Sequence, residues 1–181
     1  MPQSYLRIVL HTVFSTKYRR PTIHPRVEQE LYSYLSRRLQ LMGCRVYAIG
    51  GTLDHVHIVH GLPRTISIAK VLEDIKSQSS RWMGKNGYPD FWWQNGYGCH
   101  SVDYRKVDGI IRYVERQKEH HYGSQENYRM TARLTFEAEM LKFLREFDLD
   151  YDPQYLFPSE PKSNCQDHLG PEGTQTRKLG E

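Results

Sequence analysis

Several features that are scarce in this chain limit its fold and chemistry. Its 181 residues include only three cysteines, Cys44, Cys99 and Cys165, and none has Cys-x-x-Cys spacing. Such an odd, scattered set argues against a disulfide framework or a cysteine zinc site and favours a reducing cytoplasm. No apolar run approaches the roughly 20 residues of a membrane span, and the first residues lack a signal-peptide pattern. We therefore expect a cytoplasmic protein with no membrane partner.

Large apolar side chains almost disappear after Pro158. The segment 158–181 is instead rich in proline, glycine, serine and glutamine. Such a segment cannot bury enough surface to offset the entropy lost on ordering. We predict one folded domain over residues 1–157, which is long enough for a sizeable core, and a disordered polar tail over 158–181.

Positive charge and aromatic side chains are present in moderate excess. The formal net charge is +4, and the chain has thirteen tyrosines and three tryptophans. A mildly basic surface suits a polyanionic partner without requiring one. Aromatic rings can stack on unpaired bases, although most of them are expected to fill the core.

Hydrophobic periodicity predicts alternating strands and helices. Strands are expected at 5–14, 45–49 and 55–60, and a fourth over 91–102, where a hairpin could turn at Asn95-Gly96. Helices are expected around apolar stripes at 27–42, 68–82, 107–114 and 136–147, with breaks at 50–52 and 84–90. The resulting order, β-α-β-β-α-β-α, is that of the ferredoxin-like split βαβ fold. We therefore predict an α+β domain with an antiparallel sheet, helices on one face and additional C-terminal helices.

Two histidines alternate with apolar residues in the stretch 54–57 (DHVH). On a strand, His55 and His57 share one face with Val59, whereas His60 points to the other. Two imidazoles at this spacing can chelate a metal, but such a pair more often packs or bonds to the backbone. Asp54 either orients one imidazole or is a turn residue. Histidine-triad nucleotide hydrolases are excluded, because they need a third histidine where Val59 stands.

Tyr113 and Gln117 are four residues apart and are therefore expected on one helix face. That face flanks the apolar stripe, so both residues should be neither fully buried nor fully exposed. A phenol with a pKa near ~10 is a poor nucleophile at neutral pH and needs a nearby cation or base. A divalent metal on His55, His57 and Gln117 would meet that need. Zn²⁺ is the default for histidines alone, but its usual sites are completed by cysteine, histidine or carboxylate rather than glutamine, so Mg²⁺ or Mn²⁺ is expected. The helix pattern alone more often indicates a boundary tyrosine and a surface glutamine.

Five segments, taken together, resemble the single-tyrosine HUH transposases of small bacterial insertion sequences, whose relatives include the REP-associated tyrosine transposases. They cover most of residues 5–157: HTVFSTKYR, AIGGTLDHVHIVHGLPRTISIAKVLEDIKSQSSRWM, WWQNGYGCHSV, YVERQKEHH and FEAEMLKFLREFDLDYDPQYLF. The resemblance implies that His55, His57 and Gln117 hold a divalent metal, Mg²⁺ or Mn²⁺, and that Tyr113 is catalytic. It also implies a homodimer in which the histidine pair of one subunit works with the tyrosine of the other. Such enzymes cut single-stranded DNA beside hairpins, forming a 5′-phosphotyrosine link and freeing a 3′-OH.

Candidate DNA contacts are basic residues of the first loop and the second predicted helix: Lys17, Arg19, Arg20, Lys76 and Arg81. For each of them a solvated basic face is an equal alternative. Trp92 and Trp93 either stack on bases or pack in the protein, and His120 and His121 receive no role. Two other functions stay open. One is a domesticated, non-mobile relative that binds or cuts palindromic DNA for its host. The other is a phosphoesterase acting on small molecules, which would not need Tyr113.

Overall fold

The structure is a computed structural model and describes residues 5–122, 136–146, 150–152 and 156–158, without the side chains of 120–122. The predicted tail after Pro158 lies outside the described residues, as do Phe147 and the side chains of His120 and His121.

Four strands form one antiparallel sheet. They are β1 (Val9–Ser15), β2 (Val46–Gly51), β3 (His55–Gly61) and β4 (Gly98–Ser101), in the order β2-β3-β1-β4. The two central strands, β1 and β3, pair along their whole length, and β4 pairs with the other edge of β1. This is the strand order of a split βαβ unit, so the predicted ferredoxin-like α+β fold is confirmed.

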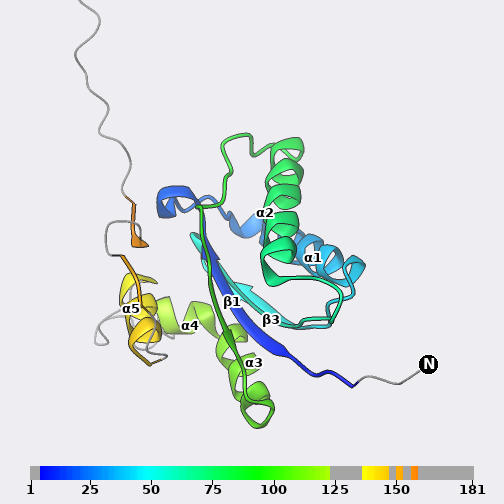
Figure 1. Ribbon diagram of the computed structural model, residues 1–181. Helices are drawn as coiled ribbons and strands as arrows, with labels where there is room; N and C mark the ends of the chain where they lie inside the picture. The colour runs from blue at the N-terminus through cyan, green and yellow to red at the C-terminus, as the bar shows by residue number, and fades with distance from the viewer. Residues whose placement is uncertain (1–4, 123–135, 147–149, 153–155, 159–181) are drawn as a thin grey trace, which may run out of the picture.

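Helices cover both faces of the sheet and make three layers (Figure 1). On one face, α1 (Pro25–Leu41) and α2 (Ile68–Lys85) enclose the main apolar core. On the other face lie α3 (Val107–Glu115), which packs on β2 and β3, and α5 (Phe136–Glu146), whose apolar stripe packs on β1. The short α4 (Gln117–Tyr122) follows α3 directly.

Alternation along β3 divides its side chains between these layers. Val56 and Ile58 belong to the core under α1 and α2, while Val59 packs with α3. His55 and His57 share the face of Val59, and His60 lies on the opposite face, where its Nε2 is 3.1 Å from Thr12 Oγ1. The predicted division of the strand is confirmed, and His60 is a core histidine on the face away from Tyr113.

Local signals set several helix ends. The Ser67 side chain accepts the N–H of Lys70 and caps α2. Gly43 follows α1 with a φ of +79°, the left-handed conformation that ends many helices. Asp103 caps a short 3-10 turn, η2 (Tyr104–Lys106), that leads into α3.

Four sequence-based expectations of local structure were wrong. Gly50 and Gly51 are the last residues of β2 rather than a break, and Gly84 lies inside α2. No hairpin forms at Asn95-Gly96, because β4 pairs with β1, and 91–97 runs as an irregular segment joined to Thr16 by one bridge. The helix expected to carry both Tyr113 and Gln117 ends at Glu115, so these residues lie on α3 and α4.

None of the described helices has the length and apolar character needed to cross a membrane.

Candidate active site

His55 and His57 lie side by side on the face of β3 that α5 covers. Both are almost fully buried, with 1% and 2% of their surface exposed, and their ring centres are 5.2 Å apart. Burying two imidazoles this close is unfavourable unless their polar atoms are used. The pair is therefore better explained as a binding element than as packing.

Neighbouring side chains fix the orientation of both rings through Nδ1. His55 Nδ1 lies 2.7 Å from Asp54 Oδ1 and 2.8 Å from Thr52 Oγ1, and His57 Nδ1 lies 2.9 Å from His11 Nε2. An N–H donated at Nδ1 leaves the Nε2 lone pair available, as in histidines that ligate metals. Burial raises the pKa of Asp54, but the combined effect of its hydrogen bonds with His55 and Thr52 and of electrostatic attraction to His55 and Arg19 lowers it. Asp54 is thus an orienting carboxylate rather than only a turn residue.

Both Nε2 atoms face Glu139 of α5. The carboxylate oxygens of Glu139 lie 4.0 Å from His55 Nε2 and 3.8 Å from His57 Nε2. One ligand atom from each of the three residues falls within 4.8 Å of the others. Burial raises the pKa of Glu139, partly countered by His55, so a cation between the three groups would favour its charged form.

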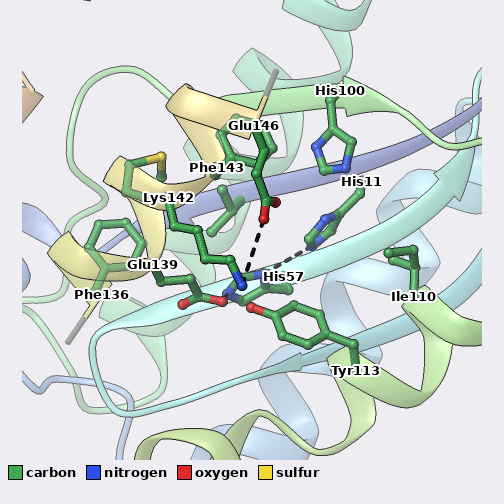
Figure 2. Close-up of a pocket in the computed structure, with 12 residues that line it drawn as sticks. His11, His57, His100, Ile110, Tyr113, Phe136, Glu139, Lys142, Phe143 and Glu146 are labelled. Carbon is green, nitrogen blue, oxygen red and sulfur yellow. Dashed lines mark hydrogen bonds and ion pairs between the residues drawn. The ribbon is translucent and has the colours of Figure 1, made fainter. Parts of the chain in front are cut away.

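Sequence reasoning missed Glu139. A signal was available, because Glu139 is three residues after Phe136 and adjacent to Met140, both of which face the sheet. An acidic residue beside an apolar stripe is usually solvated, however, and only the docking of α5 shows that this one lies next to His57 (Figure 2) and faces His55 as well.

Tyr113 enters the same pocket from α3. Its ring centre is 5.9 Å from that of His57 and 6.2 Å from that of His11, with the ring edge-on to both. The side chain is half-buried, as predicted. Figure 2 shows its hydroxyl directed toward His57 and Glu139. One chain therefore brings a phenol and the histidine pair together.

Gln117 differs from its expected position. It is 1% exposed rather than at a boundary, and it is not among the described residues that line the pocket around Tyr113. Neither amide atom of this buried side chain has a hydrogen-bond partner in the described part of the chain. Leaving a buried amide without a partner costs about 1–3 kcal/mol, and the role of Gln117 as third ligand stays a prediction.

Two further histidines, His11 and His100, extend the site across the sheet and were not singled out from the sequence. They face each other on β1 and β4, with ring centres 4.9 Å apart. Burial, with smaller contributions from His100 and His60, lowers the pKa of His11 to about 3, and burial lowers that of His100 to about 4. Both rings are therefore neutral at pH 7, and a neutral His11 can accept the N–H of His57.

Comparison with known proteins identifies the family. A sequence profile of IS200-like transposases matches residues 4–117. The chain belongs to this family. No curated protein matches this transposase.

Two solved structures share the transposase fold. A protein from Deinococcus radiodurans R1 assigned as a transposase is 22% identical, with a TM-score of 0.52, covering 65% of this chain and 96% of its own. A REP-associated tyrosine transposase bound to a REP hairpin is 15% identical, with a TM-score of 0.53, covering 84% of this chain and 91% of its own.

The basic residues predicted to contact DNA have different environments in the transposase. Lys17 and Arg20 are exposed, and with Tyr18 and Trp92 they line a hollow beside the first loop. Arg81 is exposed on α2. All three side chains are exposed to solvent, and their contact with DNA stays a prediction.

Arg19 and Lys76 are less exposed and make polar contacts within the protein. Arg19 forms an ion pair of 2.8 Å with Glu137 of α5. Lys76 Nζ donates to the carbonyl oxygens of Gln94 and Gly96, at 2.7 and 2.6 Å, and burial lowers its pKa to about 8. Lys76 thus holds the segment that carries Trp92.

Proposed function

We propose that this transposase cuts and rejoins single-stranded DNA through a covalent link to Tyr113. The observation that carries the proposal is a half-buried phenol beside a buried pair of histidines whose Nε2 atoms converge on a carboxylate. The family supports DNA cleavage as the activity. The fold shared with a REP-associated tyrosine transposase bound to a REP hairpin supports hairpin-bearing single strands at element ends as the substrate.

The reaction exchanges one phosphoester for another. Tyr113 Oη attacks the phosphorus, a bond forms between them, and the bond from phosphorus to the 3′-oxygen breaks. The phenol loses its proton as it attacks, and the departing 3′-oxygen takes one to become a hydroxyl. The product is a 5′-phosphotyrosine, whose bond energy allows a 3′-OH to reseal a strand without ATP.

The donor set fits a divalent cation. Two imidazole nitrogens and one carboxylate oxygen converge, and each imidazole is oriented through its other nitrogen. When bound, Mg²⁺ or Mn²⁺ would polarise the scissile phosphate and stabilise the charge that develops on it. In this conformation Glu139 is placed to be the third ligand, and Gln117 is the alternative that the family resemblance implies.

The resemblance also implies a homodimer with shared active sites. Excision of a DNA segment needs two cuts, and a symmetric dimer would supply two tyrosines. The proximity of Tyr113 and His57 within one chain means that a single subunit holds both groups. A dimer stays a prediction, which light scattering at micromolar concentration checks. A cytoplasmic location, expected from the scattered cysteines, stays a prediction.

Capture of the covalent intermediate tests the proposal. Labelled single-stranded DNA with an element-end hairpin is incubated with Mg²⁺, and a protein–DNA adduct is sought on a denaturing gel. The adduct is expected for the wild type and absent for Tyr113→Phe, which should still bind the hairpin. Tyr104→Phe, at an exposed tyrosine outside the pocket, is the matched control. An adduct in Tyr113→Phe would refute the assignment of the nucleophile. Hydrolysis without any adduct would indicate an ordinary phosphoesterase.

A further inference from the structure

Trp92 is the most exposed tryptophan of the described chain, although its neighbour is buried. Trp92 is 58% exposed, whereas Trp93 is 7% exposed. The Trp93 ring packs edge-on against Phe14 and Phe91, and its Nε1 donates to Ser79 Oγ at 2.8 Å. The sequence left both tryptophans open to a structural or a base-stacking role. The structure separates them, because Trp93 anchors the segment and Trp92 is left at the surface.

The segment that carries Trp92 is rigidly attached to the rest of the domain. The backbone N–H of Lys17 donates to the carbonyl oxygen of Trp92. Lys76 Nζ donates to the carbonyl oxygens of Gln94 and Gly96. Gln94 N–H donates to the Ser15 carbonyl, and the Gln94 side chain accepts the Tyr18 N–H. Because the backbone that carries Trp92 is already fixed, little further backbone entropy is lost when a nucleobase stacks on the indole.

Two hollows with basic side chains meet at Trp92. One is lined by Lys17, Arg20 and Trp92, with Asp90 as its acidic member. The other lies between α2 and the segment 92–97, where Arg81 and the exposed Tyr97 line it. Its acidic member, Glu73, is already paired with Lys70 at 2.9 Å. Cations on both sides of an exposed aromatic ring are what a nucleic-acid strand with splayed bases requires.

The first hollow is connected to the histidine pair through the backbone. Ser15 pairs with His55 across the sheet, and Thr16 N–H donates to the Asp54 carbonyl. Just beyond Thr16, Tyr18 and Arg19 have φ values of +56° and +55°. Non-glycine residues rarely adopt this conformation. The strained turn therefore places the basic loop at the end of the strands where Asp54 orients His55.

We propose that Trp92 and Tyr97 form a stacking platform for an unpaired nucleobase of a single DNA strand. Arg81 on one side of the platform, and Lys17 and Arg20 on the other side, bind the backbone phosphates of that strand. The inference rests on the proposed function, because it assigns a subsite for the same DNA substrate. Arginine and lysine provide the sequence-independent part of such binding, and the rings provide selectivity for unpaired bases.

Fluorescence anisotropy with labelled oligo(dT), and with an abasic strand of the same length, tests the platform. Trp92→Ala should weaken oligo(dT) binding roughly 5- to 150-fold, the range for one lost stacking contact, and leave binding of the abasic strand unchanged. Trp92→Phe should retain most of the oligo(dT) affinity. Tyr104→Ala, which removes an equally exposed ring elsewhere, is the matched control and should not alter binding.

The outcomes distinguish this inference from the function on which it rests. If the wild type bound neither strand, the proposed function would fail and the platform with it. If the wild type bound oligo(dT) and Trp92→Ala bound it equally well, only the platform would be refuted. An equal loss for oligo(dT) and the abasic strand would also refute stacking, since it would show that Trp92 acts without a base.

Discussion

Gly50 controls how closely the tyrosine helix can approach the histidine pair. It lies on β2 directly across from His57, and the backbone of α3 passes over it. A Cβ at this position would lie 2.1 Å from the Val114 carbonyl oxygen, whereas ordinary contacts begin at 3.4 Å. Helix α3 would therefore have to retreat by about 1 Å, and it would carry Tyr113, the residue before Val114.

We expect Gly50→Ala to slow formation of the covalent adduct by about 100-fold, because a displacement of about 1 Å can have that effect on a positioned nucleophile. Crowding of this kind should also lower the free energy of unfolding by about 1–3 kcal/mol. The affinity for Mn²⁺ should change little if His55, His57 and Glu139 form the site, since none of them is on α3. Single-turnover cleavage measures the first effect, urea unfolding the second and calorimetric titration the third.

Gly61→Ala provides a matched control at another strand glycine. The nearest atom to its added Cβ is 3.5 Å away, an ordinary contact, so cleavage should be normal. If Gly50→Ala remained folded and cleaved DNA within about threefold of the wild type, a difference of less than 1 kcal/mol, the packing of α3 on Gly50 would not be what positions Tyr113.

Three other predictions concern the ligands and the buried histidines. Glu139→Gln should weaken Mn²⁺ binding by at least roughly 10- to 100-fold, the effect of losing a hydrogen-bond partner of a metal ligand. Gln117→Ala should leave the Mn²⁺ affinity unchanged. The reverse result in the same titration would make Gln117 the third ligand. His11→Leu should weaken Mn²⁺ binding roughly 10- to 100-fold through the lost acceptor for His57, and unchanged affinity would contradict that positioning role. Because burial lowers the pKa of His11 to about 3 and of His100 to about 4, the unfolded chain binds more protons than the folded one below pH 6.5. The free energy of unfolding should therefore fall as pH drops from 6.5 toward 4, by up to about 1.4 kcal/mol per pH unit for each group. In His11→Leu, urea unfolding at several pH values should show a pH dependence that is weaker by the contribution of one such group.

The sequence was informative where a pattern has one local meaning. Alternation placed His55 and His57 on one face of β3, and apolar residues at helical spacing located α1 and α2. It was less informative where the outcome depends on distant contacts. Gly50 reads as a strand breaker, yet it lies in β2 because α3 needs a residue without a side chain beneath it. Glu139 reads as a solvated acid until α5 is docked, and the end of α3 at Glu115 has no proline or glycine to mark it.

The alternation along β3 has a consequence for how this protein can change. Val56 and Ile58 face the core under α1 and α2, while His55 and His57 face Glu139, so stability and chemistry depend on alternate residues of one strand. Substitutions at the first set should alter melting temperature with little effect on cleavage, and those at the second should do the opposite. A slip of one residue in register would exchange the two sets, placing imidazoles in the apolar core and aliphatic side chains in the pocket. Selection for stability and selection for catalysis therefore both preserve the same strand pairing, while the residues on the two faces of β3 can change independently of each other.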